Sequence, residues 1–467
     1  MIVVSDRGPR ALTADGRVVE RNGSVTKLLA RQLARVGEPA TWMAPTTGEL
    51  HRWPDRLDEL SRCPGAPSAR HVPIQVSPEA YHGYYLMAGA RMLWMALHAL
   101  ETRAAGGPAT ERAVADYAGV NAAVADAVTA SASPDEPVLV QDYQLALVPG
   151  MLRERGFTGP ISFFLHTAFD AGSFTRLGSG LADDWLRSLC TADVLFFQDR
   201  RWRDGFQEAV RHRLGEGRAG PPPLPRLRVR PVTLGRADVA ALRASRPAGE
   251  PPELAWDARR VNALFVGRLD PAKNVERCVV AFEDLLRGRP DLAGTVRLTL
   301  LLVPSRESLP EYAEYAGRVT GHCDRVRHRF PGSLHVVSGD DQGRALWAMT
   351  HADVVVANSV RDGGNLAVQE AVGLNERGCR LVISSGLGVA ELLRNGAHVI
   401  ADPCSVEETR SALGAAVDVA AGPDGRDAPE SRLAAAREAL DRCHPEAWLA
   451  SQLESCREAV SCGSGHR

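Results

Sequence analysis

The chain contains almost no lysine. Lys27 and Lys273 are the only two lysines among 55 basic residues, and the other 53 are arginine. A chain that uses arginine almost everywhere can retain a lysine where a compact point charge is needed, because ammonium and guanidinium groups are not interchangeable. Chance is the alternative, above all for Lys27, so the location of each lysine decides between the two explanations.

Other absences exclude whole classes of protein. The 467 residues carry a formal net charge of −2, so there is no basic excess to neutralise a nucleic acid or an anionic membrane surface. No apolar run approaches the roughly 20 residues that a membrane helix needs. The nine cysteines form no C-x-x-C pair, which favours reduced structural thiols and suggests no zinc site.

The segment at the start of the sequence also lacks a targeting signal. Met1 leads directly into the apolar run 2–4, without a basic segment or a cleavage site, so nothing resembles a signal peptide. We therefore expect a cytoplasmic protein with no nucleic-acid and no membrane partner. A homo-oligomer is compatible with this composition.

Strand-like apolar runs alternate with helical patterns along the whole chain, which predicts an α/β fold with parallel sheets. The predicted strands are 2–5, 40–44, 138–141, 161–165, 194–198 and 227–232 in the first half, and 261–266, 296–303, 334–337, 353–357, 380–384 and 398–400 in the second. The predicted helices between the strands of the first half include 24–36, 88–99, 113–129 and 202–213.

Two stretches rich in proline and glycine, 215–225 and 246–252, mark the predicted boundary between domains. We predict two doubly wound, Rossmann-like domains, at 1–235 and 236–444, that face each other across a cleft. Residues 445–467 are predicted to form a terminal helix and tail that packs back on the N-terminal domain.

The most informative stretch is DVVVANSVRDGGNLAVQE at 353–370, which reads as a strand, a glycine turn and a helix. Two adjacent glycines let the backbone approach a ligand, and the N–H groups and positive dipole end of a helix N-terminus suit a diphosphate. Glu370 is placed one and a half turns into that helix, where a carboxylate could reach ribose hydroxyls. The alternative is an ordinary loop in which Asp362 or Asn365 caps the helix.

Four further polar residues follow predicted strands, where ligands bind in doubly wound sheets. Arg268 and Lys273 suit a diphosphate whose charge grows as it leaves, although Arg268 could instead form a surface ion pair with Asp270. Asp142 and His166 follow strands of the first domain. Each of these two residues alone is also compatible with a capping aspartate or a buried structural histidine.

Seven motifs occur in a fixed order: SDR at 5–7, DYQL at 142–145, FFLH at 163–166, GRLDPAKN at 267–274, PSR at 304–306, RDGGNLAVQEA at 361–371 and GVAEL at 388–392. This set resembles the trehalose-6-phosphate synthase family of retaining glycosyltransferases, whose members have the GT-B fold of two Rossmann-like domains. Within the family, ANSVRDGGNLAVQEAVGLNER at 357–377 and RRWRDGF at 200–206 resemble most the pseudo-glycosyltransferase branch that makes validoxylamine A 7′-phosphate. That branch couples a nucleotide-linked cyclitol to an aminocyclitol phosphate.

The resemblance implies an N-terminal acceptor domain, a C-terminal donor domain and a role for each matching residue. The implied catalytic residues are Arg268 and Lys273 at the donor diphosphate, Asp142 at the acceptor and His166 at the donor ring. The implied donor-binding residues are Gly23, Asp362, Gly363, Asn365, Leu366 and Glu370. The implied acceptor-phosphate residues are Arg7, Tyr85, Trp94 and Arg306.

The resemblance implies transfer of a glycosyl or cyclitol group, with retention, from a nucleoside-diphosphate donor to a sugar or aminocyclitol phosphate. The product would be a non-reducing α-linked (pseudo)disaccharide phosphate, made in natural-product biosynthesis. We expect no metal and no cofactor, because the nucleoside-diphosphate compound is a co-substrate and the cations take the place of a metal. The alternatives are a sugar-nucleotide epimerase of similar architecture and a non-catalytic regulator that binds nucleotide sugars.

Overall fold

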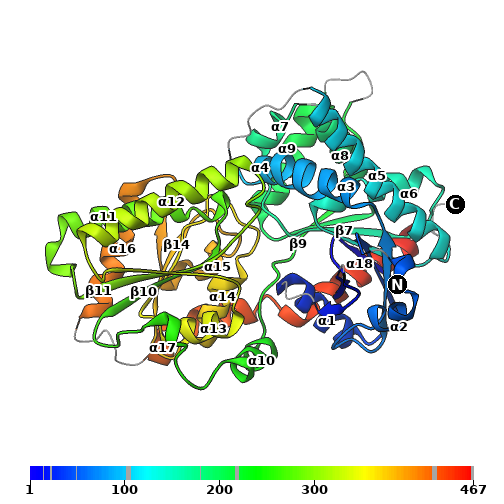
Figure 1. Ribbon diagram of the computed structural model, residues 1–467. Helices are drawn as coiled ribbons and strands as arrows, with labels where there is room; N and C mark the ends of the chain where they lie inside the picture. Colours follow the sequence, from blue (N-terminus) through cyan, green and yellow to red (C-terminus); the bar gives the residue numbers. More distant parts are fainter. Residues whose placement is uncertain are drawn as a thin grey trace. The chain divides into compact units, whose positions relative to one another are not determined.

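The computed structural model describes residues 1–13, 15–20, 24–48, 50–100, 107–178, 180–215, 220–422 and 429–463 (Figure 1). Gly23, which the resemblance assigns to the donor, lies outside these described residues. The chain forms two compact units: Met1–Pro231 with Glu446–Arg467, and Val232–Pro445. We call them the N-terminal and the C-terminal unit.

The N-terminal unit is built on a parallel sheet of seven strands with the order β5-β4-β1-β6-β7-β8-β9. Its strands are β1 (Ile2–Ser5), β4 (Ala40–Thr46), β5 (Ala69–Gln75), β6 (Val138–Gln141), β7 (Ile161–Leu165), β8 (Val194–Phe197) and β9 (Arg226–Val229). The strand order reverses between β1 and β6. Such a switch point is where open α/β sheets bind ligands, beyond the carboxyl ends of the strands.

Helices pack around this sheet because the strands are apolar on both faces. They are α1 (Ser24–Val36), α2 (Leu57–Leu60), α3 (Pro78–His82), α4 (Met95–Leu97), α5 (Pro108–Ser131), α6 (Val148–Glu154), α7 (Ala171–Thr175), α8 (Leu181–Leu189), α9 (Arg200–Leu214) and α18 (Trp448–Gly463). A large apolar core that includes Tyr84, Tyr117, Phe163 and Trp185 joins strands to helices.

The C-terminal unit repeats this plan with six parallel strands in the order β12-β11-β10-β13-β14-β15. The strands are β10 (Val261–Arg268), β11 (Val296–Val303), β12 (Leu334–Ser338), β13 (Val354–Ala357), β14 (Arg380–Ser384) and β15 (Ala397–Ile400). The helices are α10 (Arg236–Ser245), α11 (Val275–Gly288), α12 (Pro310–Arg329), α13 (Gln342–His351), α14 (Leu366–Leu374), α15 (Ala390–Leu393), α16 (Val406–Ala421) and α17 (Pro429–Asp441). Its switch point lies between β10 and β13.

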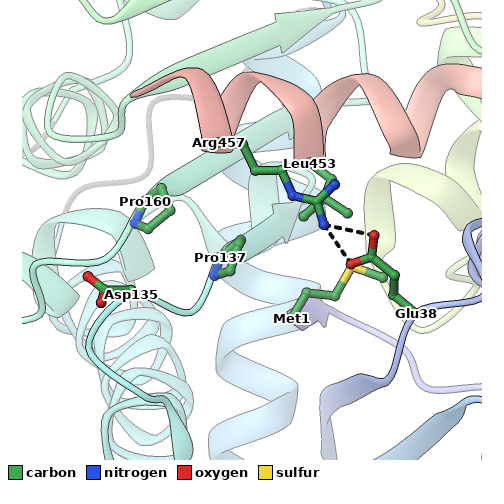
Figure 2. Close-up of a pocket in the computed structure, with 7 residues that line it drawn as sticks. All are labelled: Met1, Glu38, Asp135, Pro137, Pro160, Leu453 and Arg457. Atoms are coloured by element: carbon green, nitrogen blue, oxygen red, sulfur yellow. Dashed lines mark hydrogen bonds and ion pairs between the residues drawn. The ribbon is translucent and has the colours of Figure 1, made fainter. Parts of the chain in front are cut away.

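The last helix, α18, belongs to the N-terminal unit, where it packs against α1, β7 and β8 (Figure 1). Arg457 on this helix forms an ion pair with Glu38 at 2.7 and 2.8 Å (Figure 2). The pair borders a small pocket that is also lined by Pro137 and Pro160. These prolines precede β6 and β7, so the pocket lies at the amino ends of the strands, away from the switch point.

Three features of the N-terminal unit differ from the sequence prediction. The edge strand β5 and a short antiparallel hairpin, β2 (Arg10–Leu12) with β3 (Val18–Glu20), were not predicted. The segment predicted as an ordinary helix at 88–99 is instead a π-helix, η3 (Gly83–Trp94), followed by the short α4. A π-helix of this length is rare, and π-turns often occur at functional sites.

In the part of the chain that the structure describes, every helix is too short or too polar to span a lipid bilayer.

Candidate active site

Two loops of the C-terminal unit meet at its switch point, because the paired strands β10 and β13 end there side by side. The loop after β10 carries Arg268 at the strand end and Lys273 in a short 3-10 turn. The loop after β13 leads through the two glycines into α14. The sequence therefore predicts correctly that these segments form adjacent strand-to-helix loops.

Lys273 contacts the glycine loop directly. Its Nζ lies 2.5 Å from Oδ2 of Asp362, and the two side chains are only 19% and 14% exposed. The same carboxylate oxygen accepts hydrogen bonds from Ser359 Oγ at 3.2 Å and from Asn365 Nδ2 at 3.0 Å. Lys273 thus occupies a partly buried position in which a point charge has a defined partner, as expected for a retained lysine.

Asn365 is the N-cap of α14, and its backbone has the left-handed conformation with φ of 49°. Its Oδ1 accepts a hydrogen bond from the N–H of Val368 at 3.1 Å. The cap that the alternative interpretation assigned to Asn365 is therefore present. Capping and ligand binding are compatible here, because one side chain satisfies only one of the four N–H groups at the helix start.

The segment 386–388, which leads into GVAEL, holds the glycine loop by backbone hydrogen bonds. Gly386 O accepts a hydrogen bond from Asp362 N at 3.0 Å, and Gly388 N donates to Asp362 O at 2.9 Å. A Cβ on Gly388 would lie 1.7 Å from the carbonyl oxygen of Gly363, so this close approach requires glycine.

A second charged cluster follows β10. Asp270 is fully buried, and its Oδ2 lies 3.7 Å from Arg268 Nη2 and 3.4 Å from Arg306 Nη1. Arg306 also donates a hydrogen bond to Tyr312 Oη at 2.6 Å. An ion pair between Arg268 and Asp270 is therefore present, but Asp270 is buried, so it is not the surface pair considered as the alternative from the sequence. Only 6% of the Arg306 side chain is exposed.

At the switch point of the N-terminal unit, β1 leads into Asp6 and Arg7. Arg7 Nη2 donates a hydrogen bond to Tyr85 Oη at 2.5 Å, and its guanidinium carbon lies 5.0 Å from the centre of that ring. Asp6 accepts a hydrogen bond from Tyr84 Oη at 3.0 Å and lies 3.5 Å from Arg7 Nε. The π-helix supplies both tyrosines, so its unusual geometry positions the partners of Arg7.

Asp142 follows β6 at the same switch point and adopts φ of 73°, a conformation that few residues other than glycine take. Its Oδ1 accepts a hydrogen bond from the backbone N–H of His166 at 3.1 Å. Burial raises the pKa of Asp142 to about 7. Perturbed pKa values of this kind cluster at functional sites.

His166 follows β7 and is buried, and its Nε2 lies 2.9 Å from Oε1 of Gln141. Burial lowers the pKa of His166 to about 3, so the imidazole is neutral at physiological pH. The structure thus brings Asp142 and His166 together, one as the carboxylate and the other as its backbone donor.

The remaining predicted residues are divided between the two units. Trp94 stacks on His98 with ring centres 3.7 Å apart and is tilted against Tyr143 at 6.1 Å. Gly363, Leu366 and Glu370 belong to the glycine loop and α14. Arg306 lies in the C-terminal unit, whereas the other predicted phosphate residues belong to the N-terminal unit.

Several residues with evident roles were missed from the sequence. One is Gln369, which is buried on α14. Its Nε2 donates to Gly364 O at 3.0 Å and to Val232 O at 3.3 Å, and its Oε1 accepts from Leu234 N at 3.1 Å. Gln369 therefore ties the glycine loop to the segment at which the chain enters the C-terminal unit. Asp6, Ser359 and Gln141 were also missed, although each lies within three residues of a predicted site residue.

Within the described ranges, no group of three or more His, Cys, Asp or Glu side chains is arranged to hold a metal ion.

Known proteins resemble this chain along most of its length. Residues 38–230 and 255–437 match the model of glycosyltransferase family 20. The chain is 30% identical over 356 residues to validamine 7-phosphate valienyltransferase of Streptomyces hygroscopicus subsp. jinggangensis, covering 73% of this chain and 69% of that protein.

Two solved structures show the same fold. One is the UDP-forming α,α-trehalose-phosphate synthase of Burkholderia vietnamiensis, with a TM-score of 0.82, 21% identity and coverage of 99% of this chain and 98% of that chain. The other, from Burkholderia xenovorans, is a complex with glucose-6-phosphate, with a TM-score of 0.78, 20% identity and coverage of 98% and 99%. The predicted GT-B fold of two Rossmann-like domains is confirmed. This chain belongs to glycosyltransferase family 20, the trehalose-6-phosphate synthase family, and is a glycosyltransferase.

Proposed function

We propose that this glycosyltransferase moves a glycosyl or cyclitol group, with retention, from a nucleoside-diphosphate donor to a sugar phosphate or an aminocyclitol phosphate. The product is a non-reducing α-linked disaccharide or pseudodisaccharide phosphate, made in the cytoplasm as part of natural-product biosynthesis. One observation carries the proposal: at the switch point of the C-terminal unit, Lys273 reaches the glycine loop at the N-terminus of α14.

The donor binds at this loop. Arg268, Lys273 and the N-terminus of α14 together offer two cations and free N–H groups to a diphosphate. Lys273 exchanges its contact with Asp362 for the phosphate, which leaves Asp362 available to a hydroxyl of the transferred ring. Glu370, in the second turn of α14, binds the ribose.

The reaction is a substitution on one face of the donor ring. The bond between the ring carbon and the leaving phosphate oxygen breaks, and a new bond from the acceptor oxygen or nitrogen forms on the same face. The proton of the acceptor passes to the leaving phosphate oxygen. Arg268 and Lys273 stabilise the charge that develops on the diphosphate, which is the step at which preorganised cations contribute most.

The acceptor phosphate binds to Arg7 and Tyr85, which already contact each other, with Trp94 and Arg306 as further donors. Asp142 orients the acceptor nucleophile, and His166 contacts the donor ring. The Arg306 guanidinium already contacts Asp270 and Tyr312, so it must share or exchange one of these partners when it binds the phosphate.

The names of the relatives define the substrates to be tested. The Streptomyces relative is a valienyltransferase that acts on validamine 7-phosphate, and the Burkholderia proteins are UDP-forming synthases, one of them bound to glucose-6-phosphate. These names support a nucleoside-diphosphate donor and a phosphorylated acceptor. The experiment below determines the nucleotide base of the donor, whether the transferred ring is a sugar or a cyclitol, and whether the nucleophile is a hydroxyl or an amine.

The test is a matrix of nucleoside-diphosphate sugars and cyclitols against glucose-6-phosphate, aminocyclitol phosphates and their unphosphorylated forms. Release of nucleoside diphosphate is measured, and the product is analysed by mass spectrometry and by the proton coupling at its new linkage. We expect a phosphate-dependent coupling product with retained configuration, both with and without EDTA.

Four results would each overturn a part of the proposal. If unphosphorylated acceptors react as efficiently as phosphorylated ones, the four residues assigned to the acceptor phosphate do not bind it. Conversion of the donor to an isomer without acceptor would identify an epimerase, and tight donor binding without turnover in the whole matrix would identify a regulator. Loss of activity in EDTA that magnesium or manganese restores would disprove metal independence.

A further inference from the structure

A chain of buried polar side chains connects His166 to the C-terminal helix. His166 Nε2 lies 2.9 Å from Gln141 Oε1, and Gln141 Nε2 donates to Oε1 of Gln452 on α18 at 3.0 Å. The hydroxyl of Ser162 donates to the same Gln452 oxygen at 3.4 Å. The two glutamines lie more than three hundred positions apart in the sequence, so only the folded N-terminal unit brings them together.

These hydrogen-bonded side chains are enclosed by aromatic rings and shielded from water. Phe164 stacks on the imidazole with ring centres 4.3 Å apart, and Trp448 of α18 meets it edge-on at 5.6 Å. Gln141, Gln452 and the two aromatic residues are all buried. A hydrogen bond in such surroundings is stronger than in water, and a missing partner costs more. Apolar side chains would be enough to pack α18 against the sheet, so the buried amide groups of Gln141 and Gln452 call for another explanation.

The direction of the hydrogen bonds fixes the proton on His166. Gln141 uses its N–H₂ group toward Gln452, so it presents its carbonyl oxygen, an acceptor, to His166 Nε2. An acceptor at that position requires the proton to be on Nε2, and a neutral imidazole then carries its lone pair on Nδ1. Nδ1 is buried, and no donor within the described part of the chain reaches it.

We propose that Gln452 and Gln141 are positioning residues that hold His166 as its Nε2–H tautomer, so that Nδ1 accepts a hydrogen bond from a hydroxyl of the transferred ring. The hydroxyl of the transferred ring as a partner of Nδ1 rests on the proposed function. The assignment of the tautomer does not depend on it. The inference makes α18, which follows the C-terminal unit in the sequence, a support of the candidate active site in the N-terminal unit. Gln452 contributes only its oxygen, because its Nε2 has no partner among the described residues.

The test combines ¹⁵N NMR of the histidine side chains with steady-state kinetics on the full-length protein. Gln452→Met keeps the volume and removes the acceptor, whereas Gln452→Glu keeps an acceptor oxygen. Ser451→Ala is the matched control on the same helix, because Ser451 Oγ donates only to Ala447 O, the residue just before α18, among the contacts of the described residues. His166→Gln identifies the His166 signals by their loss, and thermal unfolding verifies that each variant is folded.

We expect Nε2–H in the wild type, in Gln452→Glu and in Ser451→Ala. In Gln452→Met we expect a mixture of tautomers and a fall in kcat of about tenfold, which corresponds to the loss of one hydrogen bond, with little change in the KM of the acceptor. An Nδ1–H tautomer in the wild type, or an unchanged tautomer in Gln452→Met, would overturn the inference. So would a changed tautomer with an unchanged kcat.

The proposed function fails separately. If the wild type transfers no group between any donor and acceptor of the matrix, the proposed function is wrong, while the NMR measurement still decides whether the two glutamines set the tautomer. If Gln452→Met does not fold, Gln141→Met provides the same test at the residue that contacts His166 directly.

Discussion

At the residue scale, the candidate donor site depends on which charges are paired. Lys273 is held by Asp362 and Arg268 lies near the buried Asp270, so both cations are preorganised beside the glycine loop. A cation aimed at developing charge contributes most in the transition state. We therefore expect Lys273→Ala and Arg268→Ala each to lower kcat by about 10²–10³, equivalent to ~2.7–4 kcal/mol, by analogy with a lost oxyanion donor.

The matched control for these variants is Arg287→Ala, which removes an exposed cation that pairs with Asp284 on α11 of the same unit. It should leave kcat and the melting temperature nearly unchanged. The measurement is nucleoside-diphosphate release under saturating donor, together with calorimetric titration of the nucleoside diphosphate. Wild-type turnover in both alanine variants would remove these residues from the donor site.

Asp142 gives a second prediction at this scale, with a defined sign. Because burial raises its pKa from 3.8 to about 7, the folded state favours the neutral carboxyl group. The contribution of Asp142 to stability is complete below about pH 4 and is lost as the pH rises through 7. Asp142→Asn keeps a neutral side chain, so its stability relative to the wild type should increase between pH 4 and 8.

The comparison uses the free energy of unfolding in urea, measured for both proteins across that range. His166 has the opposite dependence, because its pKa is lowered from 6.5 to about 3 and its contribution is lost as the pH falls below 6.5. It is present in both proteins, and its effect therefore cancels in the difference. A difference that stays constant with pH would show that the Asp142 carboxyl group is not held neutral.

At the element scale, the conformation of the glycine loop depends on its contacts with the segment 386–388. Gly388→Ala would place a methyl group against the carbonyl of Gly363, so the loop or the segment must move. We expect weaker nucleoside-diphosphate binding and a lower melting temperature. Gly317→Ala is the control, because this glycine lies within α12 in open space. It should stabilise the protein by ~0.5–1 kcal/mol, as alanine does within a helix. Unchanged donor binding in Gly388→Ala would contradict the supporting role of this segment.

The sequence predicted the buried strands well because each is a short apolar run between turn residues. It missed β5, an edge strand whose sequence ARHVPIQ contains His71 and Pro73 and shows no such run. It also missed the π-helix, because a run of apolar residues reports burial but not the hydrogen-bond spacing of the backbone. The residues at strand ends were found from loop chemistry and resemblance.

The residues that support these strand-end residues are harder to recognise in the sequence. Gln369, Gln141 and Gln452 resemble ordinary polar residues there, and their importance depends on tertiary contacts that no local pattern encodes.

At the scale of the whole molecule, the chain leaves the N-terminal unit at Pro231 and returns to it at Glu446. Trp448, Leu449 and Leu453 are then buried against that unit. Each fully buried leucine contributes about 1.5–3 kcal/mol relative to exposure. A chain that stops at residue 445 should therefore lose much of the stability of its N-terminal unit, whereas the donor residues of the C-terminal unit all remain.

The expected result is a thermal unfolding profile with a new transition at lower temperature, no transfer activity and retained binding of nucleoside diphosphate. A chain that stops at residue 463 is the control, because it keeps α18 complete, and it should behave as the full-length protein. If the chain ending at 445 loses nucleoside-diphosphate binding as well, the donor site is not a property of the C-terminal unit alone. If it keeps both stability and transfer, α18 supports neither the N-terminal unit nor His166.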